Sequence, residues 1–164
     1  MEKPVFIGVD PGINGAIAAV SANGDLISSV DFPVLGVGRK REINLPHLRR
    51  IIADIVGTSK AHACVEQVGA RPGQGVVSMF RFGRATGQIE GLLAGLLVPV
   101  IRITPQRWRK TMAIPSGAEG KEASVLSASQ LFMSADFTKK KDHNRAEAAL
   151  IAEFCRRHHQ RMEE

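Results

Sequence analysis

The stretch that decides the fold is VFIGVDPGINGAIAAVSANGDLISSV, residues 5–30. It begins with an apolar run over 5–9 that is rich in β-branched residues and ends at Asp10, which indicates a buried strand. Proline and glycine in the next five positions predict a tight turn, and a second apolar strand follows over 16–21. Asn23-Gly24 is a strong hairpin signal, so a third strand is expected over 25–30. The chain therefore opens with three antiparallel strands.

The rest of the chain alternates between helix and strand. Apolar residues at helical spacing predict helices, and shorter apolar runs predict strands. The expected helices cover 45–56, 76–97, 105–112, 121–133 and 144–159, and the expected strands cover 61–68 and 99–103. Residues 34–41 are expected to form a loop, and Thr104-Pro105 suits the cap and first position of a helix. This order predicts one α/β domain over residues 1–164, with a mixed five-stranded sheet flanked by helices.

Composition points to a globular protein with an anionic partner. The 164 residues are 44% hydrophobic, and the formal net charge is +6. An excess of Lys and Arg favours nucleic acid as a partner, although a generic basic surface gives the same charge. Cys64 and Cys155 lie in apolar stretches without metal-binding spacing, so both are expected to be buried thiols.

The same features predict where the protein works. Buried free thiols fit a reducing compartment. The first five residues have no signal-peptide pattern, and the longest apolar stretch, 92–101, is too short to span a bilayer. We therefore expect an intracellular, cytoplasmic protein that associates with DNA and not with a membrane.

Four carboxylates stand in or beside apolar segments. Asp10 ends the first strand, Glu66 lies in the fourth, and Asp142 and Glu147 flank the start of the last helix. A charge there is costly unless it is paired or bound to a metal. Phosphodiester hydrolysis needs an activated water and neutralised charge, which Mg²⁺ ions held by carboxylates supply. Structural roles compete, since Asp142 could cap the helix and Asp10 could be a turn residue. Glu66 is the hardest to explain in this way, because acids are rare in buried strands.

Three motifs, taken in order, resemble those of the RuvC-type Holliday junction resolvases. VDPGINGA at 9–16 looks like their first-strand motif, VEQV at 65–68 resembles their second acidic motif, and AEAALIA at 146–152 resembles their last helix. The Asp-Pro-Gly turn alone is also found in sugar kinases and other actin-like ATPases. The three motifs together, spread over nearly the whole chain, are more specific.

The resemblance implies a ribonuclease H-like fold, a homodimer, two Mg²⁺ or Mn²⁺ ions, and paired nicks across a four-way junction that leave 5′ phosphates. By position, it implies that Asp10, Glu66 and Glu147 are catalytic metal ligands. Family members usually carry an acid or a His three residues before the last acid, where this chain has Asn144. We therefore expect either Asp142, as a further catalytic acid, or His143 to supply the fourth metal-binding group.

Basic residues near the acids are candidates for DNA binding, because phosphate contacts position a nucleic acid. Some follow Glu66, some surround the single Trp, and some precede Asp142. With that Trp included, the candidates are Arg71, Arg81, Arg84, Arg107, Trp108, Arg109, Lys110, Lys139, Lys140 and Lys141. Trp108 could stack on a base, or it could anchor a short helix to the core. The lysine run could equally be a solvated loop.

Glycines at 83, 87, 91 and 95 recur every four residues. On a helix they form one smooth stripe that permits close packing. The partner is expected to be either the protein's own sheet or the helix of a dimer mate.

Three functions compete. The leading one is a Mg²⁺-dependent, structure-selective endodeoxyribonuclease that resolves Holliday junctions or other branched DNA, in recombination, repair or genome trimming. An actin-like ATPase would need a second half that 164 residues cannot hold. A non-catalytic branched-DNA-binding module on the same scaffold is favoured only by Asn144.

Overall fold

The computed structural model describes residues 3–67, 69, 73–117, 119–133, 135–138 and 140–163, apart from the side chains at 39, 140 and 163. Its main sheet has five strands in the order β3-β2-β1-β6-β7. These strands are β1 (Val5–Asp10), β2 (Ala16–Ser21), β3 (Leu26–Asp31), β6 (Ala61–Glu66) and β7 (Val100–Ile103). β1, β2 and β3 pair antiparallel, whereas β6 runs parallel to both β1 and β7. The expected mixed sheet with three antiparallel opening strands is confirmed.

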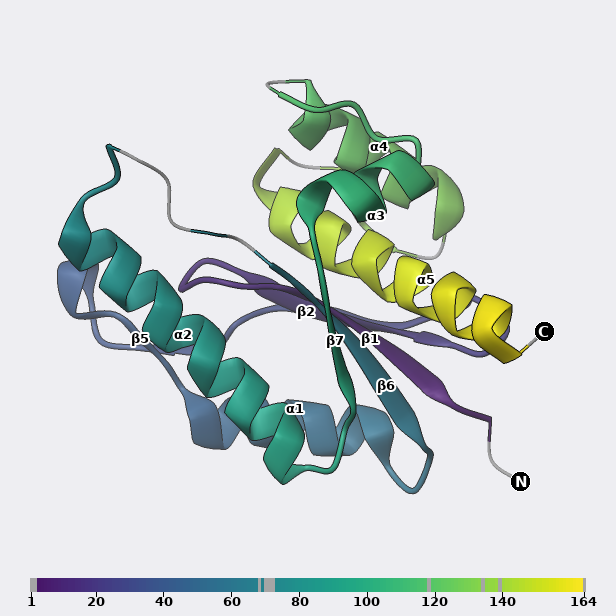
Figure 1. Cartoon of the computed structure of the whole chain (residues 1–164), viewed down its shortest axis with the longest axis horizontal. Helices are drawn as coiled ribbons and strands as arrows, with labels where there is room; N and C mark the ends of the chain where they lie inside the picture. The colour runs from purple at the N-terminus through teal and green to yellow at the C-terminus, as the bar shows by residue number, and fades with distance from the viewer. Residues whose placement is uncertain are drawn as a thin grey trace.

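Helices cover both faces of this sheet (Figure 1). On one face lie α3 (Pro105–Thr111), α4 (Gly120–Leu131) and α5 (His143–Glu163), and on the other lie α1 (Leu45–Val56) and α2 (Val76–Gly95). Side chains alternate across a strand, so Phe6 packs into the α5 side of the core and Ile7 into the α1 side. The result is three layers with a separate apolar core on each face of the sheet.

Strand β1 and helix α5 approach each other closely. A Cβ on Gly8 would lie 2.1 Å from the carbonyl oxygen of Ala148 and 2.2 Å from the backbone nitrogen of Ala152. The buried face of α5 is correspondingly rich in alanine, including Ala148, Ala149 and Ala152. Because helix and strand nearly touch, the start of α5 is fixed with respect to the end of β1.

Several expectations need correction. The loop expected over 34–41 contributes β4 (Val34–Leu35), which pairs with β5 (Glu42–Ile43), and it includes the 3₁₀ turn η1 (Gly38–Lys40). Strands of two residues are too short to show a periodicity. Helix α2 ends at Gly95 and not at Leu97, which has a left-handed φ of 59°. Thr104 precedes α3 in an extended conformation, but its side chain makes no capping hydrogen bond.

The expectation for the two cysteines is confirmed, whereas one of the two expectations for the glycine stripe is not. Cys64 and Cys155 are buried and free, as expected. No atom of another part of the described chain lies within 4 Å of a Cβ placed at 83, 87, 91 or 95, so the expectation that the stripe packs on the protein's own sheet is wrong. Among the described helices, none has the length and hydrophobicity needed to cross a membrane.

Candidate active site

Two of the expected acids end neighbouring parallel strands. Asp10 is the last residue of β1 and Glu66 the last of β6, and the register pairs Val9 with Val65. Parallel neighbours present their carboxyl ends at the same edge of the sheet. Glu147 projects from the second turn of α5, and its charge acts on both Asp10 and Glu66. The structure therefore brings these three carboxylates together.

The environment opposes negative charge on this cluster. Burial raises the pKa of Asp10 well above its usual value, and the charges of Glu147 and Glu66 raise it further, against smaller opposing effects of Arg109 and Lys121. Burial also raises the pKa of Glu66, although the hydrogen bond from Trp108 opposes this shift. The charges that oppose this shift, those of Arg109 and Lys121, are outweighed by burial and by the two glutamates. The cluster is thus short of positive charge.

Helix α3 supplies partners for the two glutamates from adjacent residues. The indole Nε1 of Trp108 donates to Glu66 Oε1 at 2.7 Å, and Nη2 of Arg109 donates to Glu147 Oε1 at 2.7 Å. The Ser124 hydroxyl lies 3.2 Å from the same oxygen of Glu147. Trp108 is fully buried, so the expectation that it stacks on a base is corrected in favour of its alternative role as a core anchor.

Asp142 and Asn144, at the start of α5, have partners outside the cluster of Asp10, Glu66 and Glu147. Asp142 is 3% exposed and accepts a hydrogen bond from Arg145 Nη2 at 2.7 Å, in a hollow that it shares with Ser29 and Asp31 near the β3 edge of the sheet. Asn144 donates its side-chain amide to the backbone carbonyl of Asn14, in the turn that follows Asp10. His143 is half-buried at the first position of α5. The assignment of Asp142 or His143 as a fourth ligand stays a prediction.

The acid cluster is a candidate site for a divalent metal ion. As arranged, no three His, Cys, Asp or Glu side chains among those described are placed to hold an ion together. Glu66 and Glu147 are engaged by Trp108 and Arg109 instead. The donor set nevertheless consists of carboxylate oxygens, which Mg²⁺ and Mn²⁺ prefer, and it carries mutual repulsion that a cation would relieve. The residues therefore fit such an ion, after side-chain adjustment.

The predicted DNA-binding residues are spread over several elements. Arg81 and Arg84 lie on α2, and Arg84 is paired with Glu42 at 3.2 Å. The guanidinium of Arg107 lies over the ring of Phe154, 5.8 Å from its centroid. Lys141 lies in the 3₁₀ turn η2 (Lys140–Asp142). Arg71, Lys139 and the side chain of Lys140 fall outside the described part of the structure.

A cavity of about 520 Å³ adjoins Glu66. Residues of α3 and of the loop that follows it line this cavity, and they are Pro105, Gln106, Arg109, Lys110, Ile114, Ser116 and Gly117. Sequence reasoning predicted Arg109 and Lys110 but missed Gln106 and Ser116, and it also missed Ser124 and Lys121 beside the acids. Their residue types are common and stand in no distinctive spacing, so no pattern in the sequence distinguishes these four.

Two solved structures share this arrangement of sheet and helices. The first is T. thermophilus RuvC in complex with a Holliday junction substrate, with a TM-score of 0.68 and 16% identity over 96% of each chain. The second is Thermus thermophilus RuvC, with a TM-score of 0.65 and 19% identity over 97% of this chain and 96% of that one. The fold is that of the RuvC resolvases. The ribonuclease H-like fold implied by the three sequence motifs is therefore confirmed.

The sequence also resembles a curated resolvase. It is 36% identical over 86 residues to the chloroplastic Holliday junction resolvase MOC1 of Chlamydomonas reinhardtii, a match that covers 51% of this chain and 10% of the relative. The chain thus spans about a tenth of the length of that protein. No protein-family model matches the chain. The predicted resemblance to RuvC-type resolvases is confirmed, whereas the single domain over 1–164 and the cellular compartment stay predictions.

Proposed function

We propose that this chain is a divalent-metal-dependent endonuclease that resolves Holliday junctions or other branched DNA by paired nicks, leaving 5′ phosphates. The observation that carries the proposal is the proximity of three acids. Asp10 and Glu66 end two neighbouring parallel strands, and Glu147, near the start of α5, lies close enough for its charge to act on Asp10. Support comes from the fold, which is shared with a RuvC that was solved with a Holliday junction.

Each residue of the site has a distinct proposed role. Asp10, Glu66 and Glu147 would hold Mg²⁺ or Mn²⁺, with Asp142 or His143 as a fourth ligand, and the bound ions would activate water and neutralise charge on the phosphate. Trp108 orients Glu66 through its 2.7 Å hydrogen bond, and because it is fully buried it fixes that orientation firmly.

DNA contact is assigned to the basic residues around the acids. Arg109 and Lys110 line the cavity beside Glu66, and cations at this position favour the phosphates of a bound strand. Further cations on α2, on α3 and in the 139–141 run would hold the arms of the branch. The net charge of +6 supports a phosphate-rich substrate.

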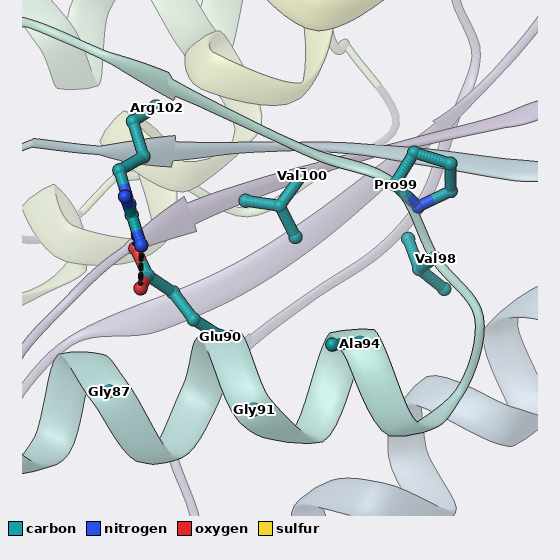
Figure 2. A pocket seen from close by; sticks show the side chains of 8 residues that line it. All are labelled: Gly87, Glu90, Gly91, Ala94, Val98, Pro99, Val100 and Arg102. Atoms are coloured by element: carbon teal, nitrogen blue, oxygen red, sulfur yellow. Dashed lines mark hydrogen bonds and ion pairs between the residues drawn. The ribbon is translucent and has the colours of Figure 1, made fainter.

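Paired nicks need two active sites, so we propose a homodimer as well. The glycine stripe of α2 is exposed, and a hollow of about 750 Å³ separates α2 from the edge strand β7. Figure 2 shows Gly87 and Gly91 along the helix, with the side chains of Glu90 and Arg102 meeting across the hollow. A smooth helix face that meets no other part of the described chain suits a second copy related by a two-fold axis.

A substitution on the stripe tests the dimer. Gly91→Leu should shift the sedimentation coefficient from that of a dimer to that of a monomer, since no atom from elsewhere in the described chain lies within 4 Å of a Cβ at this position. Ala53→Leu adds a comparable side chain to an exposed position of α1 and should leave the dimer intact. A Gly91→Leu variant that sediments as a dimer would refute this interface.

Cleavage of a labelled four-way junction, compared with linear duplex of the same sequence, tests the activity. We expect symmetric nicks in the junction with Mg²⁺ and none with EDTA. Asp10→Asn should abolish the nicks while junction binding persists. Full cleavage by Asp10→Asn would show that the site is wrongly assigned.

The non-catalytic binding module is the second candidate, and Asn144 favours it. Its amide is bonded to the backbone of Asn14 instead of offering a carboxylate to the cluster. Tight junction binding without cleavage in any divalent metal would support this function. Gain of cleavage by Asn144→Asp would then identify position 144 as the cause.

A further inference from the structure

Arg109 forms an ion pair with the acid cluster. Its Nη2 lies 2.7 Å from Glu147 Oε1, and its guanidinium charge also acts on Asp10 and Glu66. One guanidinium therefore partly neutralises all three carboxylates. A divalent cation bound by the same carboxylates would compete with Arg109 for the negative charge of Glu147.

The slot that holds Arg109 is built for this side chain. Its guanidinium lies over the Trp108 ring at 4.9 Å from the centroid, and its Nη1 approaches the carbonyl oxygen of Pro115 at 3.5 Å. A Cβ on Gly120 would lie only 2.5 Å from that Nη1. Gly120 begins a helix and its φ is not in the left-handed region, so space for Arg109 and the neighbouring backbone, not backbone conformation, accounts for the glycine.

Arg109 can leave this slot without moving its helix. Trp108 is fully buried and bonded to Glu66, so α3 itself is fixed. The Arg109 side chain is 20% exposed and lines the 520 Å³ cavity, together with Lys110. A change of rotamer would carry the guanidinium from Glu147 into open space beside another cation.

We infer that Arg109 is an internal counter-cation, which stays paired with Glu147 until a divalent metal binds. The Arg109 side chain then turns into the adjacent cavity and binds a phosphate of the DNA. This inference rests on the proposed function, because it requires a metal at Asp10, Glu66 and Glu147. It couples the two ligands of the enzyme, since metal binding releases one phosphate-binding group. The opposing possibility is a permanent ion pair that only joins α3 to α5.

A counter-cation and a residue that orients Glu147 for the metal predict opposite changes in metal affinity, and a permanent ion pair that only joins α3 to α5 predicts no tighter binding. If Arg109 competes with the metal, then Arg109→Gln should bind Mn²⁺ roughly 3- to 10-fold more tightly, because no ion pair must be broken. If Arg109 instead orients Glu147 for the metal, the variant should bind Mn²⁺ more weakly. Arg50→Gln removes an exposed charge from α1 and is the matched control for net charge, with an affinity close to that of the original chain.

Trp108 makes the measurement possible without DNA and without turnover. It is the only Trp, and the chain has no Tyr, so the protein's Trp emission reports on the residue bonded to Glu66. Titration with Mn²⁺, followed by this emission and by calorimetry, gives the dissociation constant. Gly120→Ala is a second variant, which crowds Arg109 out of its slot while keeping the charge, and it should also tighten Mn²⁺ binding.

The outcomes separate this inference from the proposed function. If the original chain binds no Mn²⁺, the metal site itself is refuted and the role of Arg109 falls with it. If the original chain binds Mn²⁺ and the folded variants bind it equally or more weakly, only the counter-cation role is overturned. Tighter binding in either folded variant, with Arg50→Gln unchanged, supports it.

The phosphate contact has its own measurement. The salt dependence of junction binding steepens by about one unit for each added phosphate contact. With Ca²⁺ present, the slope for the original chain should exceed its slope in EDTA by about that amount, and Arg109→Gln should show no such difference. Equal differences in the two proteins would overturn the phosphate contact.

Discussion

Gly8→Ala should prevent α5 from packing on the sheet. The added Cβ would lie 2.1 Å from the carbonyl oxygen of Ala148, 2.2 Å from the nitrogen of Ala152 and 2.8 Å from its Cα. Ordinary van der Waals contact begins near 3.4 Å, so strand and helix would have to separate by about 1 Å or more. All three atoms belong to backbone, so no side-chain rotation relieves the contact.

The cost of this substitution should be large. Overpacking of a core costs about 1–3 kcal/mol where side chains can adjust, and more where they cannot. Here the separation would loosen a helix face that includes Leu150, Ile151 and Phe154. We therefore expect a loss of at least about 3 kcal/mol, a substantial part of the roughly 5–15 kcal/mol that stabilises a typical domain.

Urea unfolding followed by Trp108 emission measures this loss. Gly91→Ala, at an open position of α2, is the matched control, and its better helix propensity should add up to about 1 kcal/mol to the stability of the monomer. If Gly8→Ala unfolds within about 1 kcal/mol of the original chain and with the same m-value, the close packing of β1 on α5 is refuted.

Three further substitutions test the electrostatics of the site and of α5. Burial raises the pKa of Asp10 in the folded protein, so the native state binds more protons than the unfolded chain, and the free energy of unfolding falls as pH rises from the ordinary aspartate pKa through the folded one. Asp10→Asn should therefore be more stable than the original chain at pH 7, by on the order of 1 kcal/mol in urea unfolding, and a less stable variant would contradict this. Trp108→Phe removes the hydrogen bond to Glu66 and leaves that buried carboxylate without its donor. The free energy of unfolding, measured by circular dichroism, should therefore fall by about 2–4 kcal/mol. A loss below about 1 kcal/mol would mean that water replaces the indole as donor. For Glu153, burial raises the pKa, but the hydrogen bonds and charges of Arg156 and Arg157 outweigh it and lower the pKa overall. The ionised Glu153 therefore stabilises the fold above its unfolded pKa, and this contribution is lost as pH falls through the folded pKa. Glu153→Gln should cost about 1–2 kcal/mol at pH 7 and little at pH 3, and a cost independent of pH would refute the ionic role.

The sequence predicted the elements that depend on local pattern. The strand over 5–9, the Asn23-Gly24 hairpin and the helix over 45–56 each follow from hydrophobic period and turn residues within a short window, and the structure has all three. Element ends were less accurate, as at α2, because one residue in a left-handed conformation ends the helix without a marker in the pattern. The positions of Asp10, Glu66 and Glu147 were also predicted, since an acid at the end of an apolar run stands out.

Contacts between distant segments were not accessible in this way. Asn144 was taken as a ligand position left without its acid, yet its amide is bonded to Asn14, 130 residues earlier. The glycine stripe was expected to pack on the protein's own sheet or on a dimer mate, yet no atom from elsewhere in the described chain lies within 4 Å of a Cβ on any of its glycines. A spacing shows which residues share a helix face, but not what that face meets.

By itself, the sequence determined the order of strands and helices and the three acids, because hydrophobic period, turn residues and an acid among apolar neighbours act over a few positions. Only the tertiary structure decided that Trp108 and Arg109 hold Glu66 and Glu147, and that Asp142 is paired with Arg145 in a hollow by β3. The reason is physical. These partners are joined by packing of layers from distant parts of the chain, and the distances that select one hydrogen bond over another exist only once those layers are in contact.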